Sequence, residues 1–93
     1  MSDFLHRDVG HLPQGSAVEI VLDKQANVLL MNDAKFRAYQ NGEDFSGPGC
    51  YGGWYVQSPV RIVVPHAGRW NVAVDLGDME GRLHASINVL TPA

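Results

Sequence analysis

Three residues near the C-terminal end of the chain have the types that acid–base catalysis uses. Asp75 could orient the imidazole of His84, and Ser86 carries a hydroxyl that such an imidazole could activate. A cross-strand surface pair would explain Asp75 and His84 equally well. We therefore expect no enzymatic activity and no catalytic residues, and we keep a small hydrolase or acid–base enzyme using these three residues as the alternative.

A glycine pattern, Gly47-x-Gly49-x-x-Gly52, matches the phosphate-binding fingerprint of dinucleotide-binding folds. In those folds the glycines follow a buried strand and open a helix whose N-terminus holds the pyrophosphate. Here a polar segment containing Glu43 and Asp44 precedes the glycines, and an aromatic segment follows them. We interpret the pattern as a wide glycine-rich loop and expect no nucleotide cofactor.

Cysteine and histidine offer two further kinds of chemistry. A reactive thiolate needs a neighbouring base or cation, and none is adjacent to Cys50 in the sequence, so we interpret this residue as inert. His6 and His11, with Asp8 between them, come nearest to a metal-ligand set, but zinc sites use shorter and more recognisable spacings. We expect no metal and no other cofactor.

Aromatic residues are concentrated in the middle of the chain. Five of the eight aromatic side chains lie between positions 39 and 55: Tyr39, Phe45, Tyr51, Trp54 and Tyr55. Exposed rings of this kind stack on sugars or anchor protein partners, whereas buried rings would supply apolar area that a small domain needs. We predict that these five residues bind an unknown protein partner or small ligand, and the buried alternative stays open.

Alternating apolar residues predict the strands that would position these groups. Four segments have the period of two that places one strand face on a core: 17–23, 60–64, 70–76 and 83–89. In the third segment the inward residues would be Trp70, Val72, Val74 and Leu76. These strands predict a single all-β domain over residues 1–93, built as a mainly antiparallel β-sandwich or a partly open barrel.

One short helix is expected around residues 33–40. Asn32 or Asp33 can cap its first turn, and Gly42 can take the left-handed conformation that ends it. The preceding residues 28–31 are apolar throughout, which predicts a strand covered on both faces or a strand that meets a helix.

Short turns between successive strands predict antiparallel hairpins, in which 70–76 pairs with both 60–64 and 83–89. In that register Asp75 would face Arg82 or His84 on the outer surface, and Arg61 would lie diagonal to Asp75. We therefore predict an outer polar patch composed of Arg61, Asp75, Arg82 and His84.

The overall composition excludes several classes of partner. The 93 residues carry a formal charge of −3, and the seven lysines and arginines are scattered, which argues against nucleic acid. No apolar run approaches the length of a membrane helix, and no signal peptide precedes the first strand, so we expect a cytoplasmic protein that does not bind membranes. A single cysteine fits a reducing compartment. Whether the protein forms a homodimer stays open.

The chain resembles the bacterial domain-of-unknown-function family 1883 in four segments: FLHRDVGHL, ANVLLMNDAKFRAYQNG, CYGGWYVQSPVRIVVPHAGRWNVAVDLG and GRLHASINVL. The most specific runs are YGG, SPVRIVVP and GRWNVAVDLG. In the family pattern the position of Cys50 is usually tyrosine, that of Asn71 is often histidine, and residues 43–47 replace a more basic stretch. The resemblance implies an all-β domain without an assigned activity or catalytic residues. Such a domain can precede a Toll/interleukin-receptor-like domain, which would suit a recognition or regulatory module.

Overall fold

The computed structural model describes residues 4–77 and 83–92, which fold into two β-sheets and one helix. The strands and the helix are β1 (Phe4–Leu12), β2 (Ala17–Leu22), β3 (Ala26–Met31), α1 (Asp33–Gln40), β4 (Cys50–Tyr55), β5 (Val60–Val63), β6 (Gly68–Asp75) and β7 (Ala85–Leu90). One sheet has the order β1-β6-β3-β4 and the other β5-β2-β7, and every pairing is antiparallel. The two sheets stay separate, so the fold is the predicted sandwich rather than a barrel.

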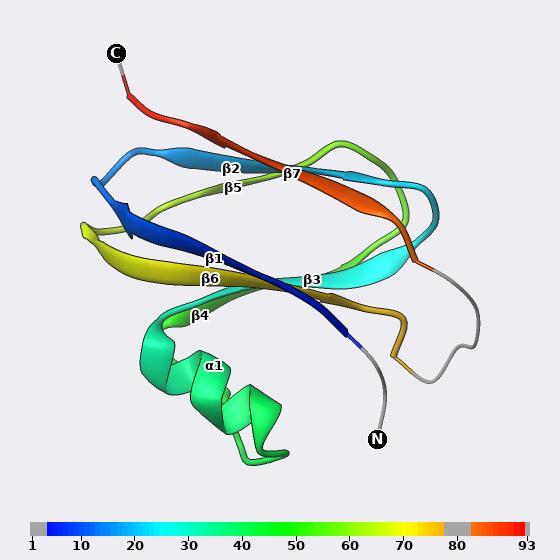
Figure 1. Ribbon diagram of the computed structural model, residues 1–93, viewed down its shortest axis with the longest axis horizontal. Coiled ribbons are helices and arrows are strands. Elements are labelled where there is room, and N and C mark those ends of the chain that lie inside the picture. Colours follow the sequence, from blue (N-terminus) through cyan, green and yellow to red (C-terminus); the bar gives the residue numbers. More distant parts are fainter. Residues whose placement is uncertain (1–3, 78–82, 93) are drawn as a thin grey trace.

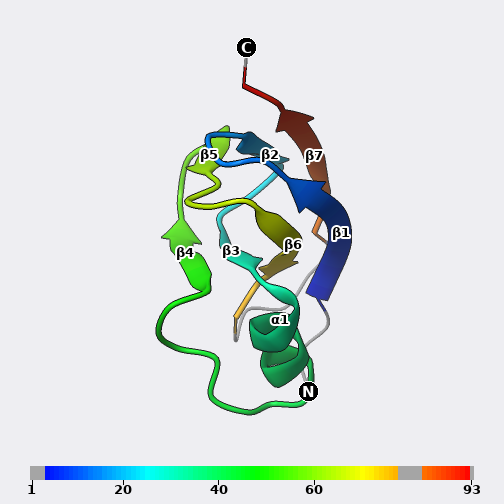
Figure 2. The same ribbon diagram turned by 90° about the vertical axis from the view of Figure 1, so that its left-hand side faces the viewer.

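The sheets form two layers, and α1 covers the outer face of the four-stranded sheet (Figures 1 and 2). The core between the layers contains the inward residues that the period of two predicted. Trp70, Val72 and Val74 of β6 meet Val18 and Ile20 of β2, and all five side chains are fully buried. The alternation therefore identified the core face of these strands correctly, because burial on one face requires it.

A second apolar cluster lies between the four-stranded sheet and α1. Its buried members are Leu29 and Met31 of β3 and Ala73 of β6, and rings from the helix side pack on them. The prediction that residues 28–31 are covered on both faces is therefore confirmed. The helix also begins and ends as predicted.

The helix ends are set by two local interactions. Asn32 Oδ1 accepts a hydrogen bond of 2.8 Å from the backbone N–H of Lys35, which satisfies one of the free N–H groups of the first turn. Gly42 follows with φ of +74°, the left-handed conformation that glycine adopts without steric cost.

Both predicted hairpins are wrong. β6 pairs with β1 and β3, whereas β5 and β7 pair with β2 in the other sheet. The connections from β5 to β6 and from β6 to β7 therefore join strands of opposite sheets rather than neighbours in one sheet. A connection between the two sheets keeps the apolar faces directed inward, as a hairpin within one sheet would. The alternation of apolar residues is therefore the same in both cases.

Strand β1 was not expected from the sequence, and an irregularity explains why. The register shifts between Asp8 and Gly10, and Gly10 has φ of +73° with its N–H bound to Asp8 Oδ1 at 2.8 Å. This β-bulge changes which residues face inward: Leu12 is buried, although the earlier even-numbered residues Phe4 and His6 face the helix side. The period of two is broken within the strand.

The glycine-rich segment is only partly a loop. Residues Cys50 to Tyr55 form β4, which pairs with β3 along its whole length.

Among the described residues, no helix is long and apolar enough to cross a membrane.

Candidate functional site

One row of side chains crosses all four strands of the larger sheet on the face that α1 covers. Asp75 of β6 is the register partner of both Phe4 of β1 and Asn27 of β3, and Asn27 is in turn the partner of Trp54 on β4. We call these four residues the Trp54 row. Register partners on one sheet face have Cβ atoms about 4.5–5.5 Å apart, so neighbouring members can interact directly.

Asp75 is the fixed polar centre of this row. Its carboxylate is almost fully buried (8% exposed) and accepts hydrogen bonds from three groups. The Gly77 N–H donates to Oδ1 at 2.8 Å, and the Tyr39 hydroxyl donates to Oδ2. Asn27 Nδ2 makes a longer contact of 3.5 Å to the same Oδ2. Three donors compensate the buried charge, so this carboxylate is held in place by its surroundings.

The Tyr39 hydroxyl is affected in return. Burial raises the pKa of this phenol, and the hydrogen bond to Asp75 and the negative charge of Asp75 raise the pKa further. Because a raised pKa favours the protonated form, Tyr39 stays a hydrogen-bond donor to Asp75 throughout the neutral range.

We expect Tyr39→Phe to lower the free energy of unfolding by about 1–3 kcal/mol at neutral pH, because Asp75 loses a donor while it stays buried. The folded pKa lies above the unfolded value of 10.0, so the stabilisation is complete below that pH and is lost as the pH rises toward the folded value. The difference between wild type and variant should therefore shrink above about pH 10. Urea unfolding at several pH values measures it, with Tyr55→Phe as the control. A difference that stays constant with pH would contradict this linkage.

Trp54 closes the other end of the row and, within residues 4–77 and 83–92, is the one exposed residue among the phenylalanines, tyrosines and tryptophans. Its side chain is 45% exposed, although it lies on a paired strand. Gly77 lies beside it, since a Cβ added at Gly77 would stand 3.6 Å from Trp54 Cζ3. The indole is thus flanked by Asn27 on one neighbouring strand and by Gly77 after the end of β6.

The five aromatic residues predicted as one binding surface are divided between three places. Tyr51 and Tyr55 pack against the core between the sheets, because alternate residues of β4 face inward. Tyr39 and Phe45 pack against the cluster beneath α1, with ring centroids 5.2 Å apart. Trp54 alone combines the predicted residue type with an exposed position.

The predicted outer polar patch does not assemble. Asp75 lies on the helix-covered face of one sheet, whereas Arg61 lies on β5 of the other, in an ion pair of 2.7 Å with Glu19. His84 precedes β7, and its backbone N–H donates to Asp23 Oδ1 at 3.1 Å. Arg82 lies outside the described residues. The incorrect hairpins account for the discrepancy, since they placed β5, β6 and β7 in one sheet.

The residues of the alternative function are separated for the same reason. His84 and Ser86 line a shallow depression at the start of β7, which also includes Asp23. Asp75 belongs to the other sheet, so it does not orient the His84 imidazole. The predicted arrangement of carboxylate, imidazole and hydroxyl is not present.

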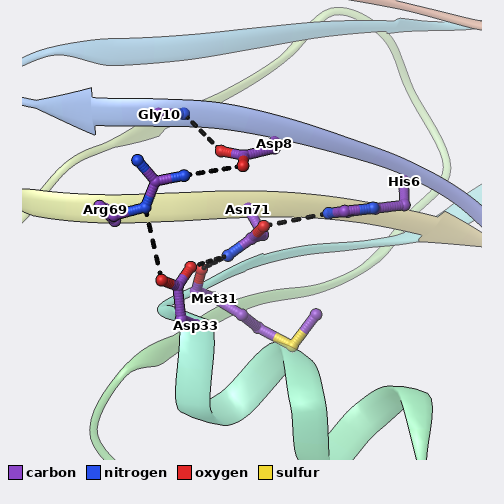
Figure 3. A network of polar contacts seen from close by, with 7 residues as sticks. All are labelled: His6, Asp8, Gly10, Met31, Asp33, Arg69 and Asn71. Carbon is purple, nitrogen blue, oxygen red and sulfur yellow. Dashed lines mark hydrogen bonds and ion pairs between the residues drawn. The ribbon is translucent and has the colours of Figure 1, made fainter.

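A second polar network fastens the first turn of α1 to the sheet (Figure 3). Arg69 bridges Asp8 at 2.8 Å and Asp33 at 3.4 Å. Asn71 Nδ2 donates to Asp33 Oδ1 at 2.8 Å and, at 3.5 Å, to the Met31 carbonyl. Strands β1 and β6 are thereby joined to the helix by side chains that are half exposed, so the ion pairs contribute modest stabilisation.

His6 completes this network. Its Nε2 lies 3.0 Å from Asn71 Oδ1, and its ring stacks on Phe36 with centroids 3.8 Å apart. Because the Asn71 amide nitrogen donates elsewhere, its oxygen must accept, and His6 Nε2 must carry the proton. His6 therefore has a structural partner.

Cys50 lies half-buried beside the helix. Burial raises the pKa of its thiol, although the positive charge of Lys35 opposes this shift. The raised pKa disfavours the thiolate at neutral pH, in agreement with the interpretation of Cys50 as inert. Within residues 4–77 and 83–92, no group of three or more His, Cys, Asp or Glu side chains is close enough to hold a metal ion.

A shallow groove begins beyond the Asn27–Trp54 pair. Its lining comes from the connection between β2 and β3 and from the connection between β4 and β5, and it includes Asp23, Lys24, Gln25, Val56, Gln57 and Ser58. Gln25 directly precedes β3 and Val56 directly follows β4, so each is two residues along the chain from a member of the Trp54 row. The groove therefore lies at the end of the two strands that carry Asn27 and Trp54.

Sequence reasoning did not identify Asn27 or Gly77 as members of this site. Asn27 lies just before the apolar run 28–31. A polar side chain next to this buried strand was the sequence feature that could have pointed to Asn27 as a site residue. Its proximity to Trp54 and Asp75 depends on pairing between distant segments, which local patterns do not specify.

Comparison with known proteins gives one match. A family model described as a domain of unknown function (DUF1883) matches residues 2–93, essentially the whole chain. No curated protein and no solved structure matches this chain.

Proposed function

The chain belongs to the DUF1883 family of domains of unknown function, and from this premise we propose that it is a non-enzymatic binding module whose contact surface is centred on Trp54. The observation that carries the proposal is the 45% exposure of this indole on a paired strand. Tryptophan combines a large apolar face with a polar N–H, and it is enriched at the centres of binding surfaces.

The position of Trp54 in the fold supports this reading. β4 is hydrogen-bonded to β3 from Cys50 to Tyr55, so the backbone that carries the indole is ordered before any ligand arrives. A preorganised side chain loses less conformational entropy on binding than a side chain on a flexible loop. The buried Asp75, with its three donors, supports the adjacent strand end in the same way.

The proposal predicts where ligands bind. We expect compounds that bind the domain to shift the NMR signals of the Trp54 indole, Asn27 and the adjacent groove, and to leave the outer face of the three-stranded sheet unchanged. A mixed panel of oligosaccharides, peptides and nucleotides provides the probes. Trp54→Ala should stay folded and lose this binding, because the ring is exposed.

The matched control is Val63→Ala, which removes an exposed apolar side chain (59% exposed) from the other sheet. This variant should bind as the wild type does. Binding that survives Trp54→Ala, or that is lost in Val63→Ala, would contradict the proposal.

A further inference from the structure

We infer that the ligand class of the Trp54 surface is a neutral sugar chain, with one ring stacked on the indole and the next residues in the adjoining groove. The inference rests on the proposed function and specifies its ligand. The observations behind it are the chemistry of the Trp54 row, the charges near that row, and the place and polarity of the groove.

The groups beside the indole suit hydroxyl groups. Asn27 is partly exposed, and among the described residues its side-chain amide is hydrogen-bonded to Asp75 alone, through Nδ2. That contact orients the side chain and leaves its carbonyl oxygen to accept a hydrogen bond from a ligand. A sugar ring offers an apolar C–H face to an aromatic ring and hydroxyl groups at its edge, so the pair of Trp54 and Asn27 matches both parts.

The charges beside the indole disfavour anions. The charged member of the row is Asp75, a carboxylate, and no lysine or arginine belongs to the row. Among the described residues of the row, a phosphate or an acidic peptide would therefore meet a negative charge without a compensating cation. In the groove, Lys24 is accompanied by Asp23, so the two charges offset each other.

The groove offers polar side chains to a chain that extends beyond a single stacked ring. Gln25 and Val56 are each two residues from the Asn27–Trp54 pair, which separates them by at most about 7 Å, so a chain with one ring on the indole can reach the groove with its next residue. Gln25, Gln57 and Ser58 supply side chains that both donate and accept hydrogen bonds. A lining of amides and a hydroxyl is suited to the many hydroxyl groups of a neutral chain.

A protein partner fits these observations less well. A stable protein interface covers about 800 Å² on each side and has an apolar centre. Here the exposed indole has polar Asn27 beside it, and Val56 is the large exposed apolar side chain that the groove adds.

The test is an NMR titration that follows the indole N–H signals of the two tryptophans. Cellohexaose, maltohexaose and N-acetylchitohexaose are each added to about 10 mM, because one stacked ring with a few hydrogen bonds corresponds to a Kd on the order of 1 mM. A decaproline peptide and ATP serve as the other ligand classes. Trp70 is an internal reference, since its indole is fully buried and donates to the His66 carbonyl at 3.2 Å.

We expect at least one of the three saccharides to shift the Trp54 signal with saturation and to leave Trp70 unchanged. Trp54→Ala should abolish saturable binding, and Trp54→Phe should retain part of it. Asn27→Ala should weaken binding about three- to tenfold, whereas Asn88→Ala, on the other sheet, should have no effect.

Two outcomes would overturn the inference. If no saccharide shifts the Trp54 signal while the peptide or ATP does, the ligand class is wrong and the proposed binding surface stands. If the saccharides bind with equal affinity in Trp54→Ala, both the inference and the proposed function are wrong.

Discussion

Replacing Trp70 with alanine is expected to lower the free energy of unfolding by about 3–5 kcal/mol, the largest loss of any single side chain in the core. Trp70 is fully buried between the two sheets, with its ring 5.9 Å from that of Tyr51. The surrounding strands are tied into two sheets and cannot collapse into the space. A domain of this size has about 5–15 kcal/mol in total, so the melting temperature should fall by about 12–40 °C.

The matched control is Trp54→Ala, which removes the same side chain from an exposed position. Its cost should be about 1 kcal/mol or less, because surface substitutions away from special features change stability little. Thermal denaturation followed by circular dichroism compares the two variants directly. Equal losses would mean that Trp54 is a core residue, and the proposed binding surface would lose the observation on which it rests.

The sequence predicted the faces of the strands better than their partners. Val18, Ile20, Trp70 and Val72 all point into the core as their period of two predicts. The same pattern is compatible with a turn to a neighbouring strand and with a turn across the core, because both keep the apolar face inward. The sequence pattern therefore could not show that β5 and β6 belong to different sheets.

The residues of β6 that point away from the core between the sheets show a second limit of prediction from the sequence pattern. Asn71, Ala73 and Asp75 alternate with the core residues of β6 and have the small or polar character of an outer surface. The structure buries all three, because α1 covers that side of the sheet and β1 pairs alongside β6. Since β1 contains a bulge at Asp8 and Gly10, its pattern did not reveal the strand that pairs with β6 at this edge of the sheet.

The candidate site was predicted in part. The exposed Trp54 belongs to the predicted aromatic group, but Tyr51 and Tyr55 alternate with it on β4 and face the core. The intervening glycines conceal that alternation, because Gly52 and Gly53 have no side chain to show which face they occupy. A glycine-rich loop was the simplest interpretation, and the pairing with β3 is what makes the segment a strand.

Gly52→Ala is expected to disrupt that pairing and to lower the free energy of unfolding by about 3–5 kcal/mol. A Cβ at this position would stand 2.1 Å from the Val28 carbonyl oxygen, a contact that requires the backbone to move. The φ of +125° adds strain, since residues with a side chain rarely adopt it. Because Val28 lies in the middle of β3, the displacement would affect the strand pair that holds Asn27 beside Trp54.

Gly53→Ala is the matched control for this substitution. Its φ of +159° lies at the extended edge of the same range, and a Cβ there meets no atom within 4 Å, so the expected loss is smaller by at least about 2 kcal/mol. Urea unfolding measures both variants, and the exposure of Trp54 to acrylamide reports the position of the indole. Equal losses in the two variants would contradict the close approach of β4 to β3 at Gly52. A larger loss in Gly52→Ala, with altered Trp54 quenching in the folded fraction, would show that this glycine determines the strand register on which the binding surface depends.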